Sequence, residues 1–178
     1  MTALIVSATP EEAAHLPATL PVVITGVGKV AAATAVATAL ANRRDVTEVV
    51  NIGSAGALRD GLEGLHEIGR VWNHDLSAVV LRTLGYDPRE WLTLGDGEIA
   101  LATGDVFVTD ADLRALLAKE AHLVDMEGYA VAWAAQQAGV PVRLVKHVSD
   151  NADEASMDWP TLVDHSAREL AAWVAENV

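Results

Sequence analysis

The chain has 178 residues, of which 51% are hydrophobic and 21% are charged, and its formal net charge is -13. This composition is sufficient for the hydrophobic core of a single domain over residues 1–178, and it excludes a disordered chain. The acidic excess argues against partners such as nucleic acid or an anionic membrane, because both attract clusters of Lys and Arg. The chain holds no cysteine, so disulfide and thiolate chemistry are excluded.

The N-terminal segment 1–16 does not have the pattern of a signal peptide. It lacks a basic beginning, and Ser7, Thr9 and Pro10 interrupt its apolar run. The sequence contains no run of about 18 apolar residues, so we expect no membrane span. We therefore expect a soluble, cytoplasmic protein.

Short apolar runs, typical of buried strands, alternate along the chain with longer periodic stretches, typical of helices. In chain order the expected elements are strands 3–6 and 21–25, helix 29–42, strand 48–52, a strand near 66–72, a short helix near 76–84, strand 98–102, helices 110–120 and 126–138, strand 140–148 and helix 158–177. Another short helix is expected after Glu11 and Glu12. This alternation predicts an α/β domain with a mostly parallel sheet.

Polar and glycine residues collect where the predicted strands end. These segments are "SATPEE" (7–12), "GVGK" (26–29), "GSAG" (53–56), "TGDVF" (103–107) and "SDNAD" (149–153), and "VDMEG" (124–128) opens a helix at the same level. In sheets of this kind, ligands bind at the carboxyl ends of the strands. The sequence therefore predicts a site at this edge of the sheet.

Two of these glycine segments allow more than one interpretation. "GVGK" is not a phosphate loop, because Val23 stands where the first glycine is required and Val30 follows the lysine. We favour a strand-to-helix turn that lines a site without binding nucleotide phosphates. In "GSAG", Ser54 lies either in an ordinary turn or among backbone N–H groups that hold an oxygen or an anion. Both interpretations of this second segment stay open.

Glu127 is an acid at the start of a helix whose other residues are mainly apolar. On the predicted helix it shares a face with Ala130, Val131 and Ala134, a face that should belong to the core. Glu127 therefore either reaches out of the helix end into water or points into a site. Lys146 and His147 pose a related question, since they alternate at a strand end and one of them must face inward.

Three carboxylates, those of Glu12, Glu127 and Asp150, are expected to converge on one edge of the sheet. Carboxylates in different environments can divide acid and base roles. A site with acidic residues and without basic residues suits a cationic transition state, as in the hydrolysis of a glycosidic bond.

The six histidines have no spacing typical of a metal site, so we expect no metal.

The same residues carry a resemblance to a known family. The strings "SATPEEAAHL", "GVGKVAAA", "VVNIGSAGAL", "LATGDVFV", "VDMEGYAVA" and "VPVRLVKHVSDNAD" cover most of the chain. The chain resembles the nucleosidase and nucleoside phosphorylase superfamily, in particular the 5'-methylthioadenosine/S-adenosylhomocysteine nucleosidases, in a form shorter by roughly a quarter. The resemblance implies a three-layer α/β/α sandwich around a mixed, mostly parallel sheet. It also implies cleavage of a purine nucleoside without a cofactor, by a homodimer.

The resemblance also implies a role for each candidate site residue. Asp150 would protonate N7 of the leaving base and recognise its amino edge, and Glu12 would activate the attacking water. The substrate-binding roles fall to five residues: Ser54 for a water or a ribose hydroxyl, Phe107 for stacking on the base, the Val108 backbone for the base edge, Met126 for the sugar, and Glu127 for the ribose hydroxyls.

Other positions bear on which reaction is catalysed. Phosphorylases of the superfamily carry an arginine just before the "GSAG"-like turn, where this chain has Asn51. Because phosphate needs cationic or several N–H donors, we favour water as the nucleophile. Lys146 stands where an arginine is common, and Asp125 where a glutamate is common; we expect Asp125 to cap the helix or support the site. The alternatives are a purine nucleoside phosphorylase and a non-catalytic nucleoside-binding protein.

Overall fold

The computed structural model describes residues 2–153, 156 and 159–178. The strands are β1 (Thr2–Ser7), β2 (Val22–Ile24), β3 (Val46–Ala57), β4 (Leu65–Glu67), β5 (Arg70–Asn73), β6 (Trp91–Thr93), β7 (Ala100–Thr103), β8 (Leu123–Asp125) and β9 (Val142–Asp150). The helices are α1 (Lys29–Asn42), α2 (Ala78–Thr83), α3 (Ala111–Leu117), α4 (Gly128–Gln137) and α5 (Trp159–Asn177).

All of these strands join one mixed sheet. Its centre is parallel, because β3 pairs in parallel with both β1 and β9, and β2 continues the parallel pairing beyond β1. On the other side, β5 and β8 pair in parallel with β7. The pairings β3–β8, β4–β9 and β5–β6 are antiparallel. The prediction of a mixed, mostly parallel sheet is therefore confirmed.

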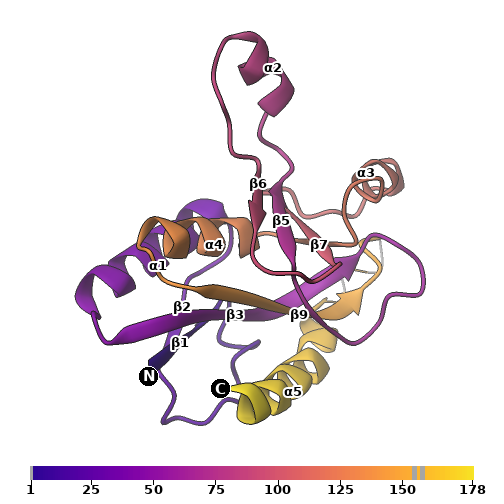
Figure 1. The fold of residues 1–178 in the computed structure, drawn as a ribbon. Coiled ribbons are helices and arrows are strands. Elements are labelled where there is room, and N and C mark those ends of the chain that lie inside the picture. Colours follow the sequence, from indigo (N-terminus) through magenta and orange to yellow (C-terminus); the bar gives the residue numbers. More distant parts are fainter. Residues whose placement is uncertain (1, 154–155, 157–158) are drawn as a thin grey trace.

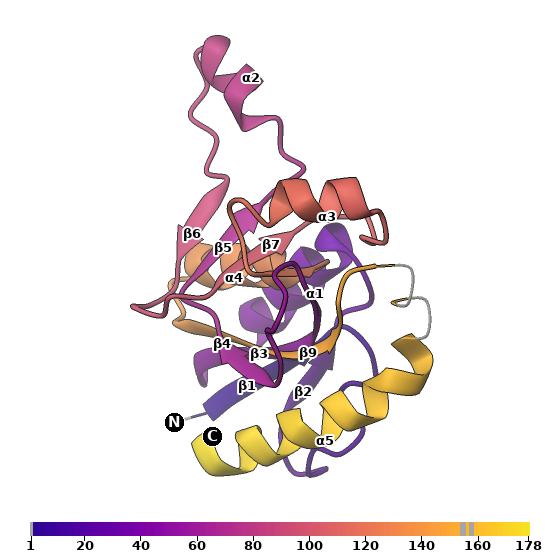
Figure 2. The same ribbon diagram turned by 90° about the vertical axis from the view of Figure 1, so that its right-hand side faces the viewer.

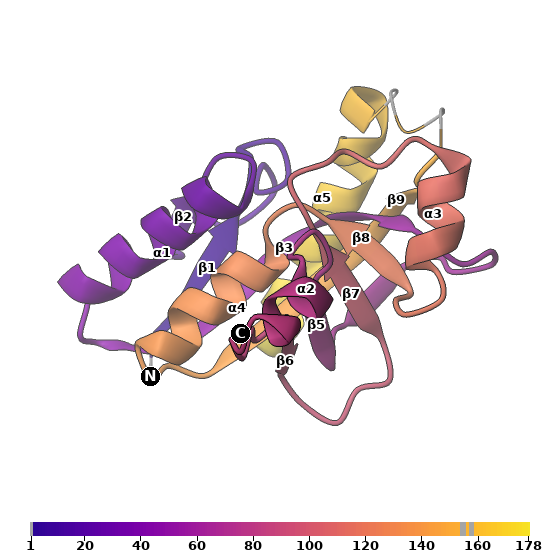
Figure 3. The same cartoon turned by 90° about the horizontal axis from the view of Figure 1, so that it is seen from above.

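Helices cover both faces of this sheet. Helices α1 and α4 lie on one face and α5 lies on the other (Figure 1; Figure 2), and α1 and α4 run side by side (Figure 3). Successive side chains of a strand point to opposite faces. In β1, Leu4 and Val6 accordingly join the core beneath α1 and α4, whereas Ile5 packs with Leu170 and Val174 of α5. The domain is a three-layer sandwich, as predicted.

The connection between β5 and β6 forms an arm that projects from the body of the domain and carries α2 (Figure 1). Several of its apolar side chains are exposed to solvent: Val79, Val80, Leu84 and Tyr86. Among the described residues, no helix combines the length and the apolar composition needed to cross a membrane.

Most of the predicted elements are present, with several corrections. The short helix expected after Glu11 and Glu12 is wrong, because residues 10–15 form turns. The strand expected near 66–72 is divided at Ile68 and Gly69 into β4 and β5, while β6 and β8 were not predicted. Both unpredicted strands have only three residues, too few for an alternating pattern. The last helix is confirmed from Trp159, and residue 158 of its predicted range lies outside the described residues.

Candidate active site

A cavity of about 260 Å³ lies where the five polar segments and the segment 124–128 meet. Its walls come from the segment after β1, the glycine turn before α1, the carboxyl-terminal parts of β3 and β9, the loop after β7 and the segment between β8 and α4. Every residue predicted for the site lines this cavity: Glu12, Ser54, Phe107, Val108, Met126, Glu127 and Asp150. The expected convergence of the segments on one place is therefore confirmed.

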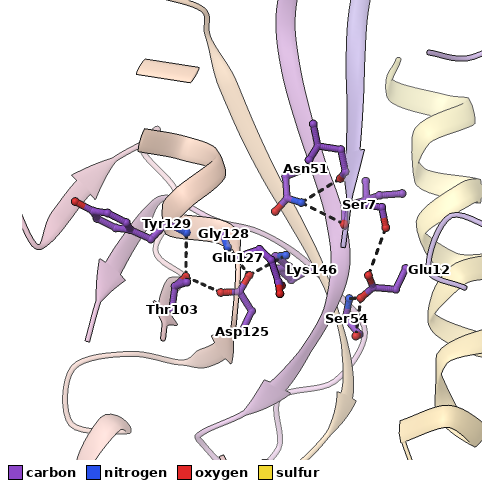
Figure 4. A network of polar contacts seen from close by, with 12 residues as sticks. Ser7, Glu12, Asn51, Ser54, Thr103, Asp125, Glu127, Gly128, Tyr129 and Lys146 are labelled. Atoms are coloured by element: carbon purple, nitrogen blue, oxygen red, sulfur yellow. Dashed lines mark hydrogen bonds and ion pairs between the residues drawn. The ribbon is translucent and has the colours of Figure 1, made fainter. Parts of the chain in front are cut away.

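Glu12 is buried in this cavity and held in a fixed orientation (Figure 4). Its Oε1 accepts hydrogen bonds from the Ser54 backbone N–H at 2.7 Å and from the Ser54 Oγ–H at 2.8 Å. Its Oε2 accepts longer contacts, at 3.3 Å, from Ser7 Oγ and from the Thr9 amide and hydroxyl. The backbone of "GSAG" thus does hold an anion, and the anion is the carboxylate of the protein's own Glu12.

The "GSAG" segment is not a turn, because β3 continues through it to Ala57. Its glycines instead allow charged groups to approach the strand closely. A Cβ atom on Gly53 would lie 3.1 Å from Lys146 Nζ and 3.2 Å from Glu12 Oε1. A Cβ atom on Gly56 would lie 3.0 Å from Asp150 Oδ1. Side chains at these two positions would therefore displace both predicted catalytic carboxylates.

Asp150 ends β9, and three donors among the described residues hold it. Ser149 Oγ donates to its Oδ2 at 2.6 Å, and Ser156 Oγ donates to its Oδ1 at 2.6 Å. The Ala152 amide also donates to Oδ1, at 2.8 Å. These bonds fix the carboxyl group at the rim of the cavity, so its position does not depend on a ligand.

Glu127 points into the cavity, which decides between the two interpretations of this acid. The prediction that Glu127 shares a helical face with Ala130 and Val131 is wrong, because Glu127 precedes α4 and its backbone is not helical (φ -131°, ψ -28°). Its Oε1 accepts a hydrogen bond of 2.7 Å from the Gly28 amide. Burial raises the pKa of Glu127 to about 7, and the nearby Asp125 carboxylate adds to this rise. Glu127 therefore titrates near neutral pH.

Asp125 and Lys146 form a buried ion pair. Lys146 Nζ lies 2.9 Å from Asp125 Oδ2, and each side chain is only 2% exposed. Asp125 also accepts hydrogen bonds from the Gly128 amide at 2.8 Å and from Thr103 Oγ1 at 2.5 Å. Asp125 is not the N-cap residue of α4, which is Glu127, but its side chain accepts the amide hydrogen of the first helical residue, Gly128. His147 faces the other way, and its Nδ1 lies 2.9 Å from Ser166 Oγ in α5.

The remaining wall of the cavity is apolar. Val27, from the glycine turn before α1, lines it together with Val106, Phe107 and Val108, from the loop after β7. The Phe107 side chain is half-exposed, whereas Val108 is buried. Met126, beside Glu127, contributes a further lining side chain. An aromatic ring at the opening offers a stacking surface for a planar ligand.

Comparison with known proteins connects this site to a family. A family model described as the phosphorylase superfamily matches residues 69–177. The chain belongs to the phosphorylase superfamily. Its similarity to one superfamily member, the 5'-methylthioadenosine/S-adenosylhomocysteine nucleosidase of Shewanella denitrificans, is 30% identity over 189 aligned residues. That alignment covers 87% of this chain and 81% of the relative.

Other superfamily members match over shorter segments or by fold. The aminodeoxyfutalosine nucleosidase of Helicobacter pylori is 37% identical over 84 residues, and the match spans 46% of this chain but only 36% of that relative's length. A Helicobacter pylori 5'-methylthioadenosine/S-adenosylhomocysteine nucleosidase structure superposes with a TM-score of 0.87 at 23% identity. That superposition covers 99% of this chain and 97% of the other chain, which shows a shared fold.

Sequence reasoning missed several polar residues that orient the site in this superfamily member. Thr103 links Asp125 to Tyr129. Its hydroxyl donates a hydrogen bond to Asp125 Oδ1, and the same oxygen accepts a hydrogen bond of 3.0 Å from the Tyr129 amide. Ser149 and Ser156 hold Asp150. The position of Ser149 directly before Asp150 was a usable signal, because the two residues adjoin at a strand end. The contacts of Thr103 depend on the pairing of β7 with β8, which the sequence did not reveal.

Proposed function

We propose that this chain hydrolyses the N-glycosidic bond of an adenosine-type purine nucleoside and releases the free base and the ribose moiety. One observation carries the proposal. The carboxylates of Glu12, Glu127 and Asp150 line one cavity, and no Lys or Arg occurs among the described residues that line it. Such a lining suits the oxocarbenium character of glycoside cleavage. The nucleosidases named among the relatives support the same reaction.

In the proposed reaction the base leaves as its bond to C1' breaks. Phe107 stacks on the purine, and the Val108 backbone binds its edge. Asp150 donates a proton to N7, so the electron pair of the C1'–N9 bond departs into a neutral base. Positive charge then develops on the ribose, where Glu127 accepts hydrogen bonds from the hydroxyls and Met126 packs on the sugar.

A water molecule completes the reaction at C1'. Glu12 accepts a proton from this water as the water oxygen bonds to C1', and the ribose product keeps the new hydroxyl. Ser54 supports this role, because its amide and hydroxyl both hold Glu12 Oε1 and leave the carboxylate oriented toward the cavity. Ser54 is also close enough to the cavity to contact the water or a ribose hydroxyl.

The alternative of phosphorolysis lacks support at the position where the family's phosphorylases carry an arginine. Asn51 is buried, and its Nδ2 donates to the Val6 carbonyl at 3.0 Å and to the Ile52 carbonyl at 3.3 Å (Figure 4). The Ser54 amide, a potential phosphate donor, already binds the Glu12 carboxylate. An anionic phosphate at this place would meet that carboxylate, which would repel it.

Release of the base should therefore be independent of phosphate. We expect the same rate of base release with and without inorganic phosphate, and a free sugar rather than a sugar 1-phosphate as the second product. A chromatographic assay over methylthioadenosine, adenosylhomocysteine, adenosine, inosine and futalosine tests this expectation. Strict dependence on phosphate would establish the phosphorylase alternative. Nucleoside binding by calorimetry without base release over hours would establish a non-catalytic binding protein.

We further propose that the protein acts in the cytoplasm as a homodimer. The exposed apolar side chains Val79, Val80, Leu84 and Tyr86 on the arm support self-association, since a second copy could bury them. Sedimentation equilibrium should give twice the chain mass of 18.7 kDa. A mass of 18.7 kDa at micromolar concentration would contradict the dimer. The absence of cysteine is consistent with a reducing compartment.

A further inference from the structure

Lys29, the lysine of "GVGK", has no part in the reaction described above, yet it joins three separate segments. Its Nζ donates to Asn73 Oδ1 at 2.9 Å and forms an ion pair with Asp75, both at the base of the arm. The same Nζ lies 3.6 Å from Asp105 Oδ2 in the loop after β7. The Lys29 amide donates to Asp105 Oδ1 at 2.8 Å. We call Lys29, Asn73, Asp75 and Asp105 the Lys29 clasp.

The clasp closes on itself through its acidic members. The Asp105 amide donates to Asp75 Oδ2 at 3.0 Å, so each aspartate contacts both the lysine and the other segment. The Lys29 side chain is only 18% exposed. Two carboxylates already face its ammonium group, which excludes a phosphate-binding role for this Gly-Lys pair. The positive charge instead holds parts of the protein together.

The clasp lies directly beside the wall of the cavity. On one side, Val27 precedes Lys29 by two residues and lines the cavity. On the other, Val106 and Phe107 follow Asp105 and line the same cavity. Two successive backbone amides of the glycine turn therefore support the cavity. The Gly28 amide donates to Glu127, and the Lys29 amide donates to Asp105.

The loop that carries Phe107 has few other anchors. Within the described part of the chain, residues 106–109 take part in no backbone–backbone hydrogen bond. The residues Val106 and Phe107 are 52% and 47% exposed, so their own burial does little to hold them. Burial of Val108 fixes the far end of the segment. The near end depends on Asp105, and Asp105 depends on the clasp.

We propose that Lys29 is a positioning residue that holds the 105–108 segment in the geometry that binds the purine. The inference rests on the proposed function, in which Phe107 stacks on the base and the Val108 backbone binds its edge. Lys29 touches no reacting atom. Its effect therefore falls on the affinity for the base and not on the chemical step that Glu12 and Asp150 perform.

The test compares Lys29→Met with Lys119→Met. Lys119 is exposed after α3 and forms no ion pair within the described residues, so it controls for the loss of one surface charge. In Lys29→Met, the Kd for adenine and the KM for nucleoside should rise about tenfold, the scale of a weakened base–aromatic stack, while kcat stays near its original value. Hydrogen exchange should accelerate at the amides of Gly104 and Asp105, which donate to Asp125 and Asp75, and not in β9. Lys29→Arg should keep the original affinity.

The outcomes separate this inference from the proposed function. Unchanged adenine affinity and unchanged exchange in folded Lys29→Met would overturn the inference, whereas a wild-type protein that neither binds adenine nor releases it would overturn the proposed function. If Lys29→Met fails to fold, Asp105→Asn decides, because it removes the charge and keeps an oxygen for the Lys29 amide. It should weaken adenine binding in the same way, and an unchanged Kd would again overturn the inference.

Discussion

Replacement of Glu12 by Gln should reduce kcat for base release by about 100-fold or more, the usual contribution of a general base. The amide cannot accept the proton of the attacking water. The Gln oxygen can still accept the Ser54 amide and hydroxyl hydrogen bonds that hold Glu12 Oε1, so the side chain should keep its place. Binding of adenine, measured by calorimetry, should be preserved because Glu12 does not contact the base in the proposed complex.

Glu11→Gln is the matched control for this variant. Glu11 is the neighbouring residue and carries the same charge, but it is exposed and does not line the cavity. Its replacement should leave both kcat and adenine binding unchanged. Full activity of Glu12→Gln would remove Glu12 from the reaction. Equal losses in both variants would point instead to the total negative charge near the site.

The sequence predicted which residues meet at one cavity better than it predicted the surrounding elements. The residues of the site follow strands that are long and apolar enough to be recognised, and the carboxyl ends of such strands meet at one edge. Glu12 and Asp150 were therefore brought together by topology alone. The role of Ser54 as an anion holder was an open alternative, because a backbone N–H can bind an oxygen whether its segment is a turn or a strand.

The missed features are those that depend on contacts between distant residues. The Gly53 and Gly56 pair suggested a turn, since glycine is common in turns, but here it marks close approach of other side chains to a strand. The partners of Lys29 lie 44 to 76 positions away along the chain, and no local pattern identifies them. Strand β8 has three residues and directly precedes the α4 cap, so it was read as part of the helix start.

Asp125 and Lys146 belong to a cluster of buried charged groups beside the cavity. Glu12, Asp125 and Glu127 are buried carboxylates, and Lys146 is a buried cation that lowers the pKa of Glu127 against the effect of burial. Loss of one member of a buried pair leaves an uncompensated charge, which is costly. Replacement of either Asp125 or Lys146 by an uncharged residue would remove the 2.9 Å contact and leave the other charge buried without it.

Replacement of Asp150 by Asn should lower kcat for adenine release by about 100- to 10,000-fold, because the variant has no acidic proton to donate to N7. The Asn oxygen can still accept a hydrogen bond from the Ala152 amide, so residues 150–152 should keep their conformation. Asp96→Asn, at an exposed aspartate outside this cavity, is the control and should leave kcat unchanged. The decisive measurement uses 4-nitrophenyl riboside, whose leaving group departs without a proton. If the protein cleaves it, the Asp150→Asn defect should be much smaller than for adenosine. An equal defect on both substrates would mean that Asp150 acts on the ribose or the water and not on the leaving base.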